Sequence, residues 1–206
     1  MCIRDSLLLE DHGALAPGDW VIQNVANSAV GRLLIRLARD RGLRTANVVR
    51  RESLFAELRA LGADACAVDG PELAAQVKEQ TGGAPIRLAI DAVSGRATAR
   101  LAACLAENGV VCNYGSMSGE DPVMPRSVLT SGGVSLVGFV LGRGLATRSL
   151  AEVRALYADL GRQVLAGALT APVERVYPIE DIGAALAHAQ RGERAGKILV
   201  APNGPV

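Results

Sequence analysis

Apolar residues in the first fifty positions alternate between short runs and helical spacing. Pro17-Gly18-Asp19 has turn composition, and the apolar run at residues 20–22 that follows it predicts a strand. From residue 30 to residue 41, apolar side chains recur at intervals of three and four, which predicts an amphipathic helix ended by Gly42. Residues 45–49 form a second apolar run. This stretch therefore predicts a strand–helix–strand unit.

The same alternation continues along the chain. Further strands are predicted at residues 65–68, 86–90, 110–113 and 134–141, and further helices at residues 54–61, entered at Ser53, from Pro71 onward, and at 97–105 and 149–165. Strands that alternate with helices at this spacing predict right-handed βαβ units and a parallel sheet covered on both faces. The predicted fold class is α/β, with a Rossmann-type doubly wound parallel sheet.

The last forty residues have a different pattern. A strand at 173–177, a helix at 179–190 and a strand at 197–200 follow the turn-like segment Thr170-Ala171-Pro172. We therefore expect one domain at residues 7–169 and a separate segment at residues 170–206.

The first six residues have a composition of their own. Met1-Cys2-Ile3-Arg4-Asp5-Ser6 is the translation of ATG TGT ATA AGA GAC AG(N), which resembles the transposon end used to prepare sequencing libraries. We expect residues 1–6 to be an adapter artefact and the natural sequence to enter at about Leu7. A genuine short N-terminus is the alternative.

Composition narrows the class of protein. The chain has 206 residues, half of them hydrophobic, and a formal net charge of +1. The near-neutral charge and the few aromatic residues speak against binding of nucleic acid or of an anionic membrane. The apolar runs are too short to span a bilayer, and no signal peptide is visible. We expect a bacterial cytoplasmic location.

The four cysteines lack the spacing of a metal site or a redox motif. They form no CxxC pair, and none lies near a histidine at metal-ligand spacing. We expect free thiols in a reducing compartment and no metal at Cys2, Cys66, Cys104 and Cys112.

The turn between the first strand and the first helix is a candidate phosphate site. Ligands of open parallel sheets bind beyond the carboxyl ends of the strands, and a helix that begins there offers free N–H groups and a positive dipole end. The turn holds Asn27, Ser28, Ala29, Val30 and Gly31. Alanines stand at the first two glycine places of the G-x-G-x-x-G pattern, so an ordinary capped βα turn remains the alternative.

The end of the second strand indicates which dinucleotide would bind. Folds that bind NAD place an acidic residue there to hold the ribose 2′-hydroxyl, whereas this strand is followed by Arg50 and Arg51. Two guanidinium groups match a 2′-phosphate, which favours NADPH over NADH and argues against a methyltransferase. A solvated basic loop is the alternative.

Two further strand ends lie on the same predicted edge. Asp91 ends the fourth strand, where capping a turn is its simplest role. Tyr114, Gly115, Ser116 and Met117 follow the fifth strand, and the two small residues would bring backbone close to the nicotinamide.

Together these segments resemble the medium-chain dehydrogenase/reductase superfamily, and within it the zinc-independent 2-enoyl thioester reductases. The resemblance covers roughly residues 7–202. The segments that carry it are Pro17-Gly18-Asp19-Trp20-Val21-Ile22-Gln23-Asn24, Ala26-Asn27-Ser28-Ala29-Val30-Gly31, Gly42-Leu43-Arg44-Thr45, Asn47-Val48-Val49-Arg50-Arg51, Tyr114-Gly115-Ser116-Met117 and Gly196-Lys197-Ile198-Leu199.

The resemblance implies a role for each matching residue. Asn27, Ser28, Ala29 and Val30 would hold the pyrophosphate, Arg50 and Arg51 the 2′-phosphate, and Tyr114 to Met117 the nicotinamide side. Phe139, Val140 and Leu141 match a cofactor-lining stretch that usually reads Phe-Trp-Leu, and Lys197 matches a lysine that reaches the cofactor. A basic residue before an edge strand is the alternative for Lys197.

The resemblance also implies parts that this chain lacks. Such enzymes begin with a GroES-like lobe that carries a catalytic tyrosine, and residues 170–206 resemble the segment that returns to it. We therefore expect an NADPH-dependent reductase of trans-2-enoyl thioesters, of the fatty-acid-synthesis type, whose fragment is inactive alone. Relatives dimerise through the strand that starts here at Val134 and ends at Leu141, which implies a homodimer.

Other functions stay open from the sequence. A quinone oxidoreductase or a zinc-type alcohol dehydrogenase of the same superfamily would share the cofactor domain. A non-catalytic nucleotide-binding protein is the alternative from another class.

Overall fold

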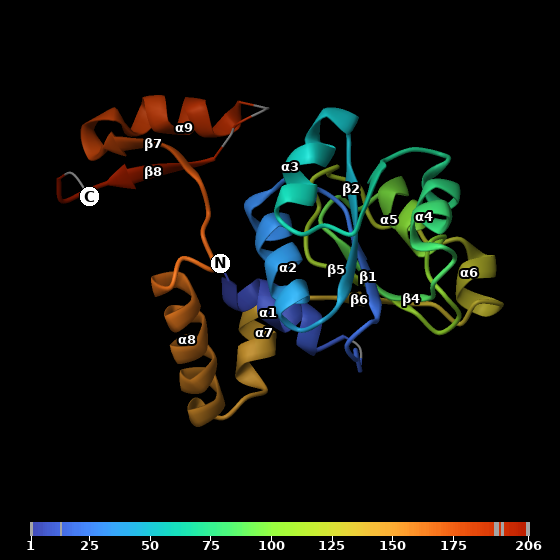
Figure 1. Cartoon of the computed structure of the whole chain (residues 1–206). Coiled ribbons are helices and arrows are strands. Elements are labelled where there is room, and N and C mark those ends of the chain that lie inside the picture. The colour runs from blue at the N-terminus through green and yellow to red at the C-terminus, as the bar shows by residue number, and fades with distance from the viewer. Residues whose placement is uncertain (1, 13, 192–193, 195, 205–206) are drawn as a thin grey trace.

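A parallel sheet forms the centre of the computed structural model, which describes residues 2–12, 14–191, 194 and 196–204 (Figure 1). Its six strands have the order β3-β2-β1-β4-β5-β6, so the chain reverses direction across the sheet between β1 and β4. The strands are β1 (Trp20–Gln23), β2 (Arg44–Val49), β3 (Ala65–Val68), β4 (Ile86–Asp91), β5 (Val110–Asn113) and β6 (Ser135–Gly138). This order confirms the predicted Rossmann-type α/β fold.

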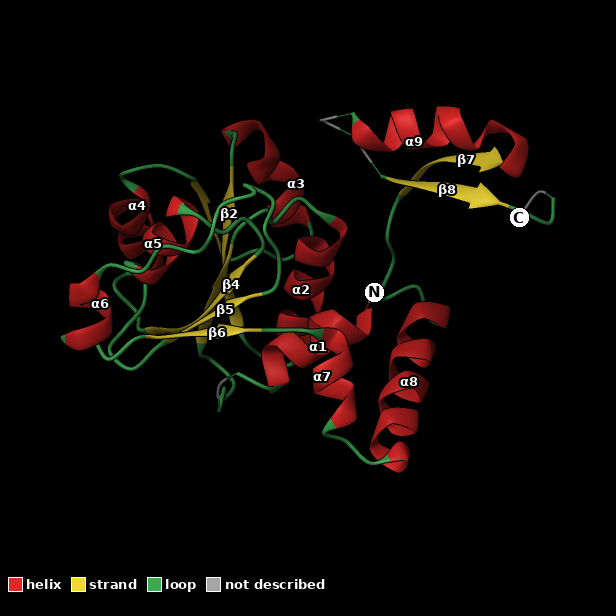
Figure 2. Cartoon of the chain, turned by 180° about the vertical axis from the view of Figure 1, so that it is seen from behind, coloured by secondary structure: helices red, strands yellow, loops and turns green. Residues whose placement is uncertain are grey.

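Helices cover both faces of the sheet (Figure 2). One face carries α1 (Cys2–Glu10), α2 (Ala29–Asp40), α3 (Phe55–Ala60) and α7 (Leu141–Ala146), with α8 (Leu150–Leu165) packed against α1. The other face carries α4 (Leu73–Thr81), α5 (Arg96–Ala102) and α6 (Arg126–Thr130). Because successive strand residues point to opposite faces, Val21 packs with Leu34 of α2, whereas Ile22 packs with Leu73 of α4. Burial on both faces explains why the strands read as continuous apolar runs.

Several elements differ from the sequence prediction. Ser53 does not cap a helix, because it lies within a 3₁₀ turn (Glu52–Leu54) that leads into α3 (Phe55–Ala60). The sequence pattern predicted no helix at α6, and helix α1 includes residues 2–6 of the segment expected to be an adapter artefact.

The strand expected at residues 134–141 is shorter and is followed by a helix. Only Ser135–Gly138 form β6, Val140 is the N-cap of α7, and Leu141 begins that helix. An apolar run of this length fits a strand and a buried helical turn equally well, so periodicity alone could not divide it. Packing of Leu145 against the core favours the helix.

The C-terminal unit, which we define as residues 173–201, stands apart from the sheet (Figures 1 and 2). It contains β7 (Val173–Pro178), a 3₁₀ turn (Ile179–Asp181), α9 (Ile182–Gln190) and β8 (Lys197–Ala201), and β7 pairs with β8 in parallel. A side-chain relay joins its elements: the Tyr177 hydroxyl contacts His188 Nδ1 at 2.9 Å, and His188 Nε2 contacts Glu174 Oε1 at 2.9 Å. No helix in the described ranges is long and apolar enough to cross a membrane.

Candidate functional site

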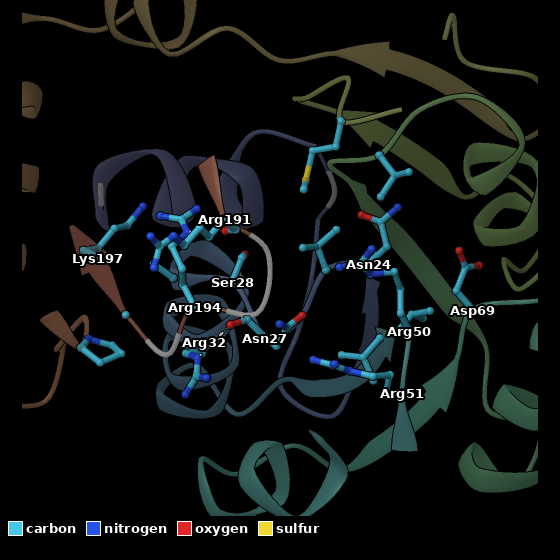
Figure 3. A pocket seen from close by; sticks show the side chains of 18 of the residues that line it. Asn24, Asn27, Ser28, Arg32, Arg50, Arg51, Asp69, Arg191, Arg194 and Lys197 are labelled. Atoms are coloured by element: carbon cyan, nitrogen blue, oxygen red, sulfur yellow. Dashed lines mark hydrogen bonds between the residues drawn. The ribbon is translucent and has the colours of Figure 1, made fainter. Parts of the chain in front are cut away.

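A pocket of about 490 Å³ opens at the carboxyl ends of β1, β2 and β4 (Figure 3). The turn before α2 forms one wall. Pro172, just before the C-terminal unit, also lines the pocket, as do Arg191, Arg194, Gly196 and Lys197, which lie between the end of α9 and the start of β8. This is the place where open parallel sheets bind ligands, at the point where strand order reverses.

The turn between β1 and α2 is fixed by close backbone packing. Ser28 caps α2, its Oγ accepting the Gly31 N–H at 3.1 Å. A Cβ on Gly31 would lie 2.5 Å from the carbonyl oxygen of Ala26, so only glycine fits. Val25 has a φ of 51°, which is strained for a β-branched residue. Such strain is typical of turns held in shape for a ligand.

The predicted pyrophosphate residues fall into two groups. Asn27, Ser28 and Ala29 line the pocket. Val30 is buried in the core, and Gly31 faces Ala26. Val30 and Gly31 therefore support the turn from behind.

A buried amide pair ties the turn to the sheet. Gln23 Nε2 donates to the Gly31 carbonyl at 2.9 Å and to Asn47 Oδ1 at 2.8 Å. Asn47 Nδ2 in turn donates to Thr45 Oγ1 at 2.9 Å. These bonds connect β1, β2 and the first turn of α2, so they set where the N-terminus of α2 lies relative to β2.

Asp91 is the centre of a second buried network. Its carboxylate, fully buried, accepts hydrogen bonds from Asn24 Nδ2 at 2.6 Å, Thr98 Oγ1 at 2.6 Å and Asn113 Nδ2 at 3.0 Å. It also accepts the backbone N–H groups of residues 93 and 94. Asp91 thus caps the turn after β4, as predicted, and joins the ends of β1, β4 and β5.

Arginines dominate the charge of the pocket. Arg50 and Arg51 follow β2 and line it, as does Arg32 from the first turns of α2 (Figure 3). The one carboxylate among its described lining residues, Asp69, is held by Arg100 through bonds of 2.6 and 2.7 Å. The pocket therefore suits an anion with several charges.

The sequence prediction missed several lining residues. Arg32 lies near the positive end of a helix, where a cation is disfavoured. A basic residue at that position of a predicted helix could have indicated from the sequence that Arg32 contacts an anion. Asp69 follows β3, and the sequence prediction assigned no ligand contact to the end of that strand. Arg191 and Arg194 carry no local signal, because only the tertiary fold brings them to the pocket.

The residues predicted for the nicotinamide side are divided between two hollows. Met117 lines the main pocket, and Lys197 does so from β8. Tyr114, Phe139, Val140 and Leu141 instead line a second hollow of about 470 Å³.

Arg4 from α1 also lines this second hollow, with its guanidinium carbon 5.3 Å from the centre of the Tyr114 ring. Burial raises the pKa of Tyr114 to about 12. Tyr114 therefore stays protonated at neutral pH.

Gly115 and Ser116 line neither of these two hollows. The Gly115 carbonyl accepts from Ser94 Oγ at 3.1 Å and from Asn113 Nδ2 at 3.0 Å, and a Cβ on Gly115 would lie 2.8 Å from the Ala92 carbonyl oxygen. Ser116 Oγ donates to the Glu120 carbonyl at 3.4 Å. Gly115 therefore anchors the loop to the Asp91 network.

The described cysteines are free thiols without activation. Cys66 and Cys112 are buried and Cys104 is half-buried. Burial raises the pKa of Cys104 and of Cys112 to about 12 and raises that of Cys66. In the described part of the chain, no three His, Cys, Asp or Glu side chains are grouped so that they could hold a metal ion.

The family model described as zinc-binding dehydrogenase matches residues 29–159, which include α2 and the strands β2 to β6. The chain belongs to this family. The predicted membership of the medium-chain dehydrogenase/reductase superfamily is therefore confirmed.

The chain is also similar to individual curated proteins and solved structures. It is 35% identical over 191 residues to the mitochondrial enoyl-[acyl-carrier-protein] reductase of Xenopus tropicalis, covering 89% of this chain and 55% of that protein. A solved structure from Bacillus thuringiensis, described as a "putative NADPH:quinone reductase", is 27% identical with a TM-score of 0.86 and covers 96% of this chain and 60% of that one.

A further solved structure shares the fold. The mitochondrial 2-enoyl thioester reductase Etr1p/Etr2p heterodimer from Candida tropicalis is 22% identical with a TM-score of 0.83, and the match covers 96% of this chain and 58% of that one. The chain thus spans about half the length of the curated relatives that it matches.

One expectation is wrong. We expected a bacterial cytoplasmic protein, yet the chain matches curated relatives that are mitochondrial enzymes of eukaryotes. The expectation failed because it rested on the absence of a visible signal and on unpaired cysteines, and neither feature identifies a compartment.

Proposed function

We propose that the pocket binds NADPH and that the chain is the cofactor half of an NADPH-dependent 2-enoyl thioester reductase. The observation that carries the proposal is the position of Arg50 and Arg51. They follow β2 and share one pocket with the capped N-terminus of α2. A helix N-terminus suits a pyrophosphate, and paired guanidinium groups suit a 2′-phosphate.

The proposed binding mode uses the residues along this edge. Asn27, Ser28 and Ala29 would contact the pyrophosphate, with Val30 and Gly31 holding the turn from behind. The nicotinamide would lie toward Met117 and Lys197, beside Tyr114, Gly115, Ser116, Phe139, Val140 and Leu141. When bound, NADPH supplies a hydride. Fixed protein groups contribute by orienting the two reactants and excluding water.

The proposed reaction reduces a trans-2-enoyl thioester. The hydride would reach the β-carbon and a proton the α-carbon, giving the saturated thioester and NADP⁺. The names of the curated relatives favour an enoyl thioester over a quinone as the acceptor. We propose that residues 170–206 belong with a further lobe that carries the catalytic tyrosine, and that residues 1–206 alone catalyse no reduction.

Titration of NADPH and NADH into the purified chain tests the cofactor. We expect NADPH to bind and NADH to bind at least tenfold more weakly, because a 2′-diol leaves the arginines without a phosphate. The double variant Arg50→Asp, Arg51→Ala should weaken NADPH binding about 100-fold and leave NADH binding within threefold. Equal affinities for the two dinucleotides would contradict the proposed role of Arg50 and Arg51. Measurable reduction of crotonyl-CoA by the chain would contradict the proposed division of labour.

We further propose a homodimer formed through β6. It is an edge strand of the sheet, with Ser135 and Gly138 exposed, so its outer hydrogen-bonding groups are available to a second copy.

A further inference from the structure

Arg32 lies where a helix disfavours a cation. It is the fourth residue of α2, beside the positive end of the helix dipole. Its side chain runs back toward the turn, where Nε donates to the Asn27 carbonyl at 2.9 Å. Nη1 forms an ion pair with Glu57 of α3. Arg32 also lines the main pocket together with Asn27, Arg50 and Arg51 (Figure 3).

The ion pair with Glu57 can be exchanged at low cost. The Glu57 side chain is 44% exposed, whereas that of Arg32 is 17% exposed. A partly exposed ion pair contributes little to stability, so Glu57 can turn to water without a large penalty. A phosphate with two negative charges accepts shorter and stronger hydrogen bonds from a guanidinium than an exposed carboxylate does.

The remaining donors of Arg32 fit such an exchange. A guanidinium has five N–H donors, and the contacts made to described residues occupy Nε and Nη1. The Nη2 nitrogen has no partner among those residues. Arg32 can therefore keep its bond to the Asn27 carbonyl and still present an edge to an anion in the pocket.

We propose that Arg32 is a third specificity-determining arginine for the ribose 2′-phosphate, held by Glu57 until NADPH binds. The inference rests on the proposed function and adds two residues to it. Binding transfers the guanidinium from the Glu57 carboxylate to the phosphate. NADH has no 2′-phosphate, so Arg32 stays paired with Glu57 and contributes nothing to NADH binding.

Three variants separate this role from a structural one. Arg32→Gln should raise the Kd of NADPH about tenfold, the worth of one charged hydrogen-bonding group, and leave the Kd of NADH within twofold. Arg32→Lys should give an intermediate Kd for NADPH, because the charge remains while the planar donor edge is lost. Arg39→Gln removes the same charge from an exposed position near the end of α2 and should change neither Kd more than twofold.

Glu57→Gln tests the exchange itself. It frees Arg32 from its competitor, so NADPH should bind about threefold more tightly while NADH binding is unchanged. A weakening of NADPH binding by Glu57→Gln would overturn the exchange. Equal losses of NADPH and NADH binding in Arg32→Gln would overturn the specificity role, because they would show that Arg32 acts only through the Asn27 turn. Failure of the unsubstituted chain to bind NADPH would instead overturn the proposed function.

Discussion

Buried polar residues differ in how many of their hydrogen-bonding groups find a partner in the fold. Asp91 accepts five hydrogen bonds, and Gln23 is bonded to two elements at once, so both strengthen the edge where the pocket lies. Asp5 is the contrasting case. Its carboxylate is fully buried, neither oxygen has a hydrogen-bond partner among the described residues, and Arg4 Nε lies 3.6 Å from Oδ1. Burying a carboxylate in this way costs free energy.

Replacement of Asp5 should stabilise the chain in a pH-dependent manner. Burial raises the pKa of Asp5 from 3.8 to about 7. The folded state therefore binds a proton that the unfolded state releases, and the stability linked to that proton is full below about pH 3.8 and lost as the pH rises through about 7. Asp5→Asn removes this loss. We expect the increase in the free energy of unfolding caused by Asp5→Asn to be on the order of 4 kcal/mol larger at pH 8 than at pH 4.

Urea unfolding at the two pH values measures this difference. Asp40→Asn serves as the control, since Asp40 is exposed at the end of α2 and its substitution should have a small effect at both pH values. An equal effect of Asp5→Asn at pH 4 and pH 8 would show that its carboxyl titrates normally in the folded state.

At the scale of elements, the contact between the β1–α2 turn and its helix determines the site. Ser28 caps α2, and Gly31 allows the helix to approach Ala26. The Gln23 side chain, from β1, holds this position by donating to the Gly31 carbonyl. The same contact aims the N-terminus of α2 at the pocket. Packing and ligand geometry are therefore set by the same few atoms.

Gly31→Ala should impair both the packing of α2 against the turn and the binding of NADPH. The added methyl group would meet the backbone of Ala26 at 2.5 Å, so the helix must shift. We expect a loss of about 3 kcal/mol in the free energy of unfolding and at least tenfold weaker NADPH binding. Gly161→Ala is the matched control, because Gly161 lies inside α8 with no atom within 4 Å of the new Cβ. It should raise stability by about 0.5–1 kcal/mol. A Gly31→Ala variant as stable as the Gly161→Ala variant would contradict the packing argument.

On the scale of the whole molecule, the chain has one well-covered sheet and one poorly covered unit. All four residues of β1 are buried, whereas five of the six residues of β7 are exposed. Large apolar side chains remain exposed on the C-terminal unit and the end of α8, among them Leu165, Leu186 and Val173. These side chains are among those that the proposed further lobe would cover.

The proposed dimer makes a prediction about the edge of the sheet. The N–H of Ser135 donates to the Gly109 carbonyl just before β5, and that of Phe139 to the Asn113 carbonyl at its end. Alternation therefore places the N–H of Gly138 on the open side of β6. Gly138→Pro removes that outer donor while β6 keeps its bonds to β5. We expect sedimentation to show a dimer for the unsubstituted chain and a monomer for Gly138→Pro, with unchanged circular dichroism. A dimer that persists in Gly138→Pro would place the contact elsewhere.

The sequence by itself determined the sheet and part of the site. Apolar periodicity gave β1 to β5, α2 and α8 within two residues, because buried parallel strands and amphipathic helices leave patterns that depend only on local order. A role fixed by local chemistry, such as that of Asp91 as the cap of its turn, could also be predicted. The arginine pair after β2 was visible because strand ends predict where a ligand lies.

Only the tertiary structure decided the rest. It divided the run after Val134 into a strand and a helix, since packing of Leu145, not periodicity, chose between them. It showed that Val30 supports the turn from the core, and it brought Arg191 and Arg194 to the pocket. Such contacts join residues far apart in sequence, so no local pattern records them. The pairing of Arg32 with Glu57 is of this kind, because it exists only once α3 packs beside α2.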